Sequence, residues 1–158
     1  MPVLPAPAPD NGYLAEHIDL LRRSLRALTG RDLLAGDSSP EAAAEWLYRA
    51  PFVLLSHDTA PDPILTYGNC CALDLFELTW DQLVQMPSRL TAEAPDREER
   101  DRLLVRVTAQ GTIDDYAGVR VSRTGRRFRI EAATVWNLTD GEGGYQGQAA
   151  TFAVWRCI

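Results

Sequence analysis

The chain has 158 residues, of which 46% are hydrophobic and 24% are charged, a composition typical of one soluble globular domain with a sizeable core. Its net charge of -6 argues against a general surface for nucleic acids or anionic membranes, because binding a polyanion needs a positive field. No apolar run approaches the ~20 residues that span a bilayer, and the three cysteines form no disulfide framework. We therefore expect a cytoplasmic protein with neither nucleic-acid nor membrane partners.

The first segment differs in composition from the rest of the chain. Residues 1–12, MPVLPAPAPDNG, are rich in proline and alanine, and alternating prolines favour an extended, solvated backbone. We predict a disordered leader over residues 1–12, a helical extension over residues 13–50 and a main domain over residues 51–158.

The extension begins with a predicted helix over residues 13–29, for which Gly30 is the C-cap. Its apolar residues recur with alternating spacings of four and three and form one seam: Leu14, Ile18, Leu21, Leu25 and Leu28. The seam either packs on the sheet of the same chain or forms a homodimer contact. We favour the sheet, because two heptads are too short for a free-standing coiled coil.

Capping residues and turns divide the middle of the chain. Ser39 and Asn69 are predicted helix N-caps, Thr79 with Gln82 forms a capping-box pattern, and Asp96 with Glu99 repeats that pattern. The predicted elements are a helix over 39–50, strands over 51–57 and 63–67, and helices over 70–78, 80–86 and 96–110.

The pattern of residues in the last third of the chain predicts three antiparallel strands, over residues 114–122, 126–138 and 145–155. If the first turn centres on Thr124 and Gly125, Val119 shares a face with Phe128 and Trp136, and Arg120 lies on the other face. A slip of one residue would exchange the two faces. The whole order predicts an α+β fold in which a five-stranded antiparallel sheet has short helices inserted after its second strand.

Several stretches carry a family resemblance when taken in order. They are NCCALDLFELTW, MPSRLTAE, REERDRLL, DYAGVRVSRTGRRFRIEAATVWNL and GQAATFAVW. Together they closely resemble the MEKHLA domain, a PAS-related family that occurs as stand-alone bacterial proteins and at the C-terminus of class III homeodomain-leucine zipper plant transcription factors. The resemblance implies a PAS-like fold and a sensory, regulatory or dimerising role. It implies no known reaction.

Two PAS cofactors fit the sequence poorly. Flavin light sensors of this class use a cysteine in an Asn-Cys-Arg-Phe motif, whereas the similar stretch here carries Ser88, and a hydroxyl is a far weaker nucleophile than a thiol. Haem sensors commonly take a histidine from the long helix before the third strand, and residues 96–110 contain none. A cysteinyl-flavin adduct and haem are therefore disfavoured, non-covalent flavin binding stays open, and the cofactor stays unknown.

No catalytic or metal-binding group stands out. Ser56, His57 and Asp58 contain the letters of a hydrolytic triad, but successive residues on a strand point to opposite faces. His17 and His57 are the only histidines, and a metal site usually needs three or four convergent ligands. We therefore assign neither catalytic residues nor metal ligands.

Arginines crowd around the predicted hairpin at Arg120, Arg123, Arg126, Arg127 and Arg129. We favour a solvated edge with cross-strand pairs to Glu131 over the alternative, an anion site or a surface for an acidic partner. Arg89 follows the short helices, where the walls of PAS cavities lie. A buried arginine there would need a carboxylate partner or an anionic ligand.

We predict a non-enzymatic sensory or regulatory module that binds a small ligand between sheet and short helices, and that forms a homodimer. Ligand occupancy would shift the packing of the leading helix. The residues expected to contact the ligand are Asn69, Arg89, Tyr116 and Trp136. Two alternatives stay open: a pure dimerisation scaffold without a ligand, and a small enzyme that uses a pocket in the curved sheet.

Overall fold

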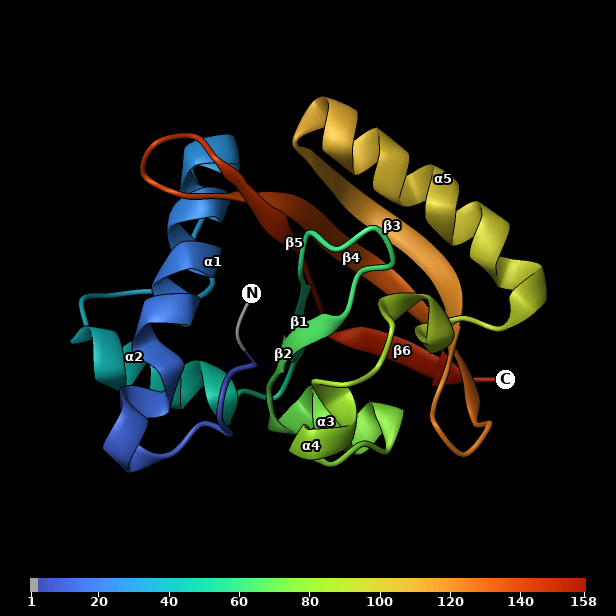
Figure 1. The fold of residues 1–158 in the computed structure, drawn as a ribbon, viewed down its shortest axis with the longest axis horizontal. Helices are drawn as coiled ribbons and strands as arrows, with labels where there is room; N and C mark the ends of the chain where they lie inside the picture. The colour runs from blue at the N-terminus through green and yellow to red at the C-terminus, as the bar shows by residue number, and fades with distance from the viewer. Residues whose placement is uncertain (1–2) are drawn as a thin grey trace.

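The computed structural model describes residues 3–158, so the first two residues of the predicted leader lie outside it (Figure 1). One antiparallel sheet runs through the molecule in the strand order β2-β1-β5-β4-β3, and β6 continues beside β4. The strands are β1 Val53–His57, β2 Leu65–Gly68, β3 Thr112–Val121, β4 Arg127–Thr139, β5 Tyr145–Phe152 and β6 Val154–Cys157. The predicted five-stranded PAS-like order is confirmed, and the last predicted strand is divided at Ala153 into β5 and β6.

Helices lie on both sides of this sheet. The helix α1 (Ala15–Thr29) packs against β4 on one face, whereas α5 (Ala94–Gln110) lies along β3 and β4 on the other (Figure 1). The other helices are α2 Pro40–Tyr48, α3 Cys70–Phe76, α4 Trp80–Leu83 and the 3-10 turn η2 Ser88–Thr91. No helix within residues 3–158 combines the length and the apolar character that a membrane span requires.

The predicted caps explain most helix boundaries. Ser39 Oγ accepts a hydrogen bond from the backbone N–H of Ala42 at 3.2 Å, and Thr79 with Gln82 closes the capping box of α4. The predicted start of α5 at Asp96 is wrong, because the helix begins at Ala94 with a proline in its first turn.

The described residues before α1 form local structure and contact the domain, whereas the sequence predicts a disordered leader over residues 1–12. Residues Pro9–Leu14 form the 3-10 helix η1, and Asn11 Nδ2 donates to the carbonyl of Ala6 at 2.8 Å. Trp80 Nε1 donates to the carbonyl of Leu4 at 2.9 Å. Both side chains donate to backbone carbonyls of the segment, and the hydrogen bond from Trp80 holds it against the domain.

The β3–β4 hairpin has a different register from the predicted one. Gly125, at φ 95°, donates its N–H to the carbonyl of Ser122 at 3.0 Å, so the loop is one residue longer than a two-residue turn. Arg120 therefore pairs with Phe128. The predicted faces of β3 are wrong for this reason, and the side chain of Arg120 lies on the α5 side of the sheet.

A second irregularity lies within β4. Ala132 adopts φ 52°, and the pairing shifts between Gly118 opposite Ile130 and Tyr116 opposite Ala133. This bulge reverses the alternation of side chains. Ile130 therefore shares the α5 side with Ala133, whereas Trp136 faces α1.

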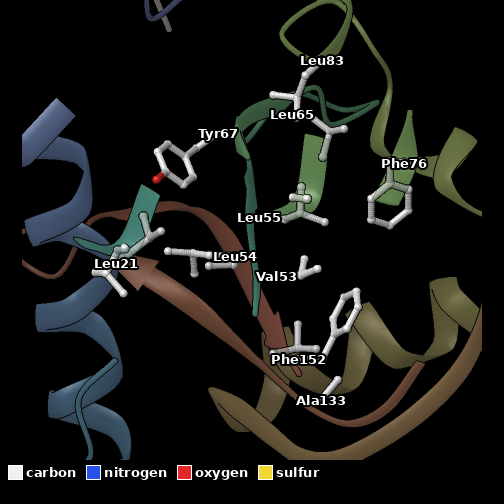
Figure 2. Close-up of a cluster of buried hydrophobic side chains, with 14 of the residues drawn as sticks. Leu21, Val53, Leu54, Leu55, Leu65, Tyr67, Phe76, Leu83, Ala133 and Phe152 are labelled. Carbon is white, nitrogen blue, oxygen red and sulfur yellow. The ribbon is translucent and has the colours of Figure 1, made fainter. Parts of the chain in front are cut away.

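The strand β1 is buried on both faces and forms the centre of the core. Figure 2 shows Leu54 on the side of Leu21 in α1, whereas Leu55 lies on the other side with Leu65. Phe152 and Ala133 extend the core toward β4 and β5 (Figure 2). A single layer of backbone thus separates α1 from the space under α5.

Candidate functional site

A cavity of about 80 Å³ lies between the sheet and the elements α3, η2 and α5. Its wall is mainly apolar, with Leu55, Leu65, Phe76, Leu103, Ile130 and Phe152. A water-sized group needs roughly 10–15 Å³ by this measure, so the cavity has room for about five to eight such groups. It fits a small molecule of a few heavy atoms.

Tyr116 and Arg120 supply the polar wall on the β3 side of the cavity. Arg120 Nη2 donates to the hydroxyl oxygen of Tyr116 at 3.0 Å, and Nη1 donates to the carbonyl of Val119 at 2.8 Å. The Tyr116 hydroxyl in turn donates to Glu99 Oε2 at 2.8 Å. Burial raises the pKa of Tyr116, so its hydroxyl stays protonated at neutral pH.

Arg100 enters the cavity from α5. Its Nη2 donates to Ser88 Oγ at 2.7 Å, and the nearest carboxylate is that of Asp101, at 3.7 Å from Nη1. Burial, with a smaller effect of the Arg120 charge, lowers the pKa of Arg100 to about 10. Arg100 therefore remains a cation at neutral pH, although only 6% of its surface is exposed.

His57 lies at the end of β1 and is 9% exposed. Its Nδ1 lies 3.0 Å from the carbonyl of Asp58, whereas Nε2 has no hydrogen-bond partner within residues 3–158. Because a carbonyl only accepts, Nδ1 carries the proton and Nε2 offers its lone pair. Burial lowers the pKa of His57, so the ring is neutral at neutral pH.

The structure brings one of the predicted ligand contacts, Tyr116, to the cavity. Asn69 is fully buried elsewhere: its side chain accepts from the N–H groups of Leu54 and Ala72 and donates to the carbonyls of Leu47 and Phe52. All its hydrogen-bonding groups are satisfied by backbone. Its role here is to join β1, α2 and α3.

Two other predicted contacts point away from the cavity. Trp136 donates from Nε1 to the carbonyl of Leu21 at 3.1 Å, on the α1 face, because the bulge at Ala132 turns it there. Arg89 is exposed and pairs with Asp62 at 3.2 Å, whereas its neighbour Ser88 lines the cavity.

The apolar seam of α1 packs on the sheet of its own chain, as we favoured. Leu14, Ile18, Leu21 and Leu25 are buried, whereas Leu28 is 41% exposed. A homodimer contact through this seam would require α1 to leave the sheet. The seam is therefore part of the core.

The predicted arginine patch does not form one surface. Arg126 and Arg127 are exposed and pair with Glu77 and Glu93, at 3.3 and 2.7 Å. Arg129 lies 3.9 Å from Glu131, as expected for a solvated edge, and Arg120 points to the cavity.

Sequence reasoning missed Arg100 and placed Arg120 on the wrong surface. Arg100 precedes Leu103 and Val107 by three and seven residues, which is the spacing of one helix face. The pattern of α5 therefore indicates that Arg100 is buried. The position of Arg120 depends on the loop length of a hairpin, which spacing alone does not reveal.

Large cofactors of PAS proteins do not fit this cavity. Flavin and haem each contain many more heavy atoms than the five to eight or so water-sized groups that about 80 Å³ holds. The three cysteines, Cys70, Cys71 and Cys157, are absent from the cavity wall. Within residues 3–158 no group of three or more His, Cys, Asp or Glu side chains is arranged to hold a metal ion.

Solved structures share the fold. A PAS domain from Colwellia psychrerythraea superposes with a TM-score of 0.62 at 15% identity, over 75% of this chain and 95% of that one. An RNA-binding light-oxygen-voltage receptor gives a TM-score of 0.61 at 17% identity, over 76% of this chain and 36% of the receptor. At such identities the likeness shows the fold, which is PAS-like.

Sequence comparison finds plant relatives. The homeobox-leucine zipper protein ATHB-14 of Arabidopsis thaliana is 27% identical over 142 residues, which are 87% of this chain and 17% of that protein. HOX29 of Oryza sativa subsp. indica is 29% identical over 108 residues, 68% of this chain and 12% of that protein. This chain thus spans less than a fifth of these curated relatives.

The model of the MEKHLA domain matches residues 15–157. The match includes α1 and α2, which lie in the helical extension that the sequence predicts over residues 13–50. The chain belongs to the MEKHLA domain family.

Proposed function

We propose that this protein is a non-enzymatic sensory module, in which a small molecule occupies the cavity under α5 and the helix α1 responds. The observation that carries this proposal is the cavity itself, a small apolar space into which buried arginine, tyrosine and histidine side chains project. Such a combination of an apolar wall with a few polar groups is typical of ligand sites. The PAS-like fold of light-oxygen-voltage receptors supports a sensory role.

The strand β1 offers a short route from the cavity to α1. Leu55 and His57 line the cavity, and Ser56 between them forms hydrogen bonds with His17 Nε2 at 2.9 Å and with Thr66 Oγ1 at 2.8 Å. Side chains alternate along a strand, so β1 contacts the cavity on one face and α1 on the other. A ligand that shifts β1 therefore also shifts the side chains that contact α1. A ligand that binds one packing of α1 better than another shifts the population between them.

Filling the cavity tests the proposal. Ala133→Leu adds a side chain that occupies the cavity, whereas Ala153→Leu places the same side chain at an exposed position. Both variants and the wild-type chain are screened by thermal unfolding against propionate, propanamide, 1-propanol and propylammonium, because binding to the native state raises the melting temperature.

We expect at least one compound to raise the melting temperature of the wild-type chain and of Ala153→Leu, but not of Ala133→Leu. Native mass spectrometry of the same samples should show the bound mass. If every compound acts equally on the filled and unfilled chains, the cavity is not a ligand site.

A further inference from the structure

The cavity carries more positive charge than its protein surroundings neutralise. Arg100 and Arg120 are 6% and 7% exposed, and both lie on its wall. Within residues 3–158 no carboxylate lies within ion-pair distance of Arg120. Among the described residues, Asp101 is the only carboxylate within ion-pair distance of Arg100, at 3.7 Å, and its side chain is 70% exposed. Burying a charge without a close partner is costly.

A further carboxylate near this wall, that of Glu99, already has a hydrogen-bond partner. Glu99 lies on the exposed side of α5, and its Oε2 accepts a hydrogen bond from the Tyr116 hydroxyl at 2.8 Å. That hydrogen bond orients the tyrosine so that its oxygen accepts from Arg120 at 3.0 Å. Arg120 and Arg100 each donate few of their five N–H groups to the protein, so further donors are available to a ligand.

Resting on the sensory function proposed above, we infer that the ligand is a short-chain carboxylate whose anionic group binds Arg100 and Arg120. A guanidinium group binds a carboxylate through two parallel hydrogen bonds. A short-chain carboxylate also carries an apolar tail, which a phosphate ion or a chloride ion lacks. The tail would contact the apolar wall at Leu55, Leu103 and Phe152. A cavity of about 80 Å³ limits the whole molecule to a few carbon atoms.

His57 adds an independent sign that this space is built for a polar ligand. Its Nε2 is buried, lies in the cavity wall and has no partner within the described residues. A buried acceptor without a donor is rare in native proteins. A hydroxyl or water bound beside the carboxylate would satisfy it.

Isothermal titration calorimetry of the full chain tests this inference with four probes of similar size: propionate, the neutral propanamide, the cation propylammonium and inorganic phosphate. We expect propionate to bind wild-type protein at least tenfold more tightly than each of the others. This comparison uses no variant, so it holds even if an arginine substitution impairs folding.

Variants then locate the anion. Arg100→Met and Arg120→Met replace a buried cation with an apolar side chain of similar length, and Arg89→Met is the matched control on an exposed arginine paired with Asp62. We expect about thirtyfold or more weaker propionate binding for the first two and an unchanged affinity for the control.

The outcomes separate this inference from the function on which it rests. If propanamide binds the wild-type chain as tightly as propionate, or if the Arg100 and Arg120 variants keep their affinity, the ligand is not a carboxylate, although the cavity still binds a small molecule. Equal binding of phosphate would make the site one for inorganic anions. If no probe binds, a carboxylate ligand is excluded. The cavity-filling comparison of Ala133→Leu with Ala153→Leu then decides whether the proposed sensory function is correct.

Discussion

Buried polar side chains have two different roles in this protein. Asn69 is fully buried and makes four hydrogen bonds to backbone groups of three neighbouring elements. Arg100 and His57 are nearly as buried, yet they leave donors or an acceptor without a protein partner. Satisfied groups stabilise the fold, whereas unsatisfied ones in a cavity indicate a ligand.

Replacing Asn69 should therefore reduce stability. Asn69→Ala removes the side-chain hydrogen bonds to the backbone groups of Leu47, Phe52 and Leu54, and we expect the free energy of unfolding to fall by about 3 kcal/mol or more. Urea denaturation followed by circular dichroism measures it. Arg89→Ala, at an exposed ion pair, is the control and should cost less than about 1 kcal/mol. Equal effects of the two substitutions would contradict the structural role of Asn69.

The pH dependence of stability should report on His17. Burial lowers its pKa from 6.5 to about 4, so between these pH values the unfolded chain binds a proton that the folded chain does not. The stabilisation is complete above pH 6.5 and is lost as the pH falls toward 4. We expect wild-type protein to lose on the order of 2 kcal/mol more than His17→Gln over this range.

His57 titrates in the same direction and is present in both proteins, so the difference isolates His17. Parallel stability curves for the two proteins would show that His17 is not protected from protonation.

At the scale of elements, local chemistry was predictable and register was not. Ser39, Asn69 and Thr79 cap helices as the sequence predicts, because a cap depends on residues a few positions apart. The faces of β3 and β4 depend on a loop one residue longer than expected and on a bulge at Ala132. Neither leaves a clear mark in the alternation of side chains.

The bulge provides a test of its own. Ala132 is exposed at φ 52°, a conformation that costs a non-glycine residue about 1–2 kcal/mol. Ala132→Gly should raise the free energy of unfolding by about 0.5–1 kcal/mol, since the added chain entropy of glycine offsets part of the gain. The neighbouring Ala133→Gly, which has no such strain, should lower it. A loss of stability in both variants would contradict the bulge.

The α1 seam should behave as core. Leu21 is fully buried against the sheet, and Leu21→Ala should lower the free energy of unfolding by about 2–5 kcal/mol, whereas Leu28→Ala, at a 41% exposed position, should cost less than about 1 kcal/mol. Chemical denaturation measures both, and light scattering reports the mass. A variant that keeps its stability but changes its oligomeric state would instead make the seam a dimer contact.

For the molecule as a whole, the PAS-like order of elements was predictable, because several family motifs follow one another along the chain. The residues of the cavity were not predictable in this way. Tyr116, predicted to contact a ligand, lies on the cavity wall, and so does Arg120, which the sequence assigns to a different surface. A cavity depends on which side chains converge across elements far apart in the chain. Here α5, η2 and β3 contribute Arg100, Ser88 and Arg120.

The sheet separates the cavity from α1, and the proposed sensory function requires that occupancy of the cavity changes the packing of α1. Hydrogen exchange of the backbone amides of α1 tests it directly, measured by mass spectrometry with and without a saturating amount of the compound that binds the cavity. We predict altered exchange across residues 15–29 in wild-type protein and in Ala153→Leu, and none in Ala133→Leu. Identical exchange of α1 in bound and free wild-type protein would contradict this coupling between the cavity and α1.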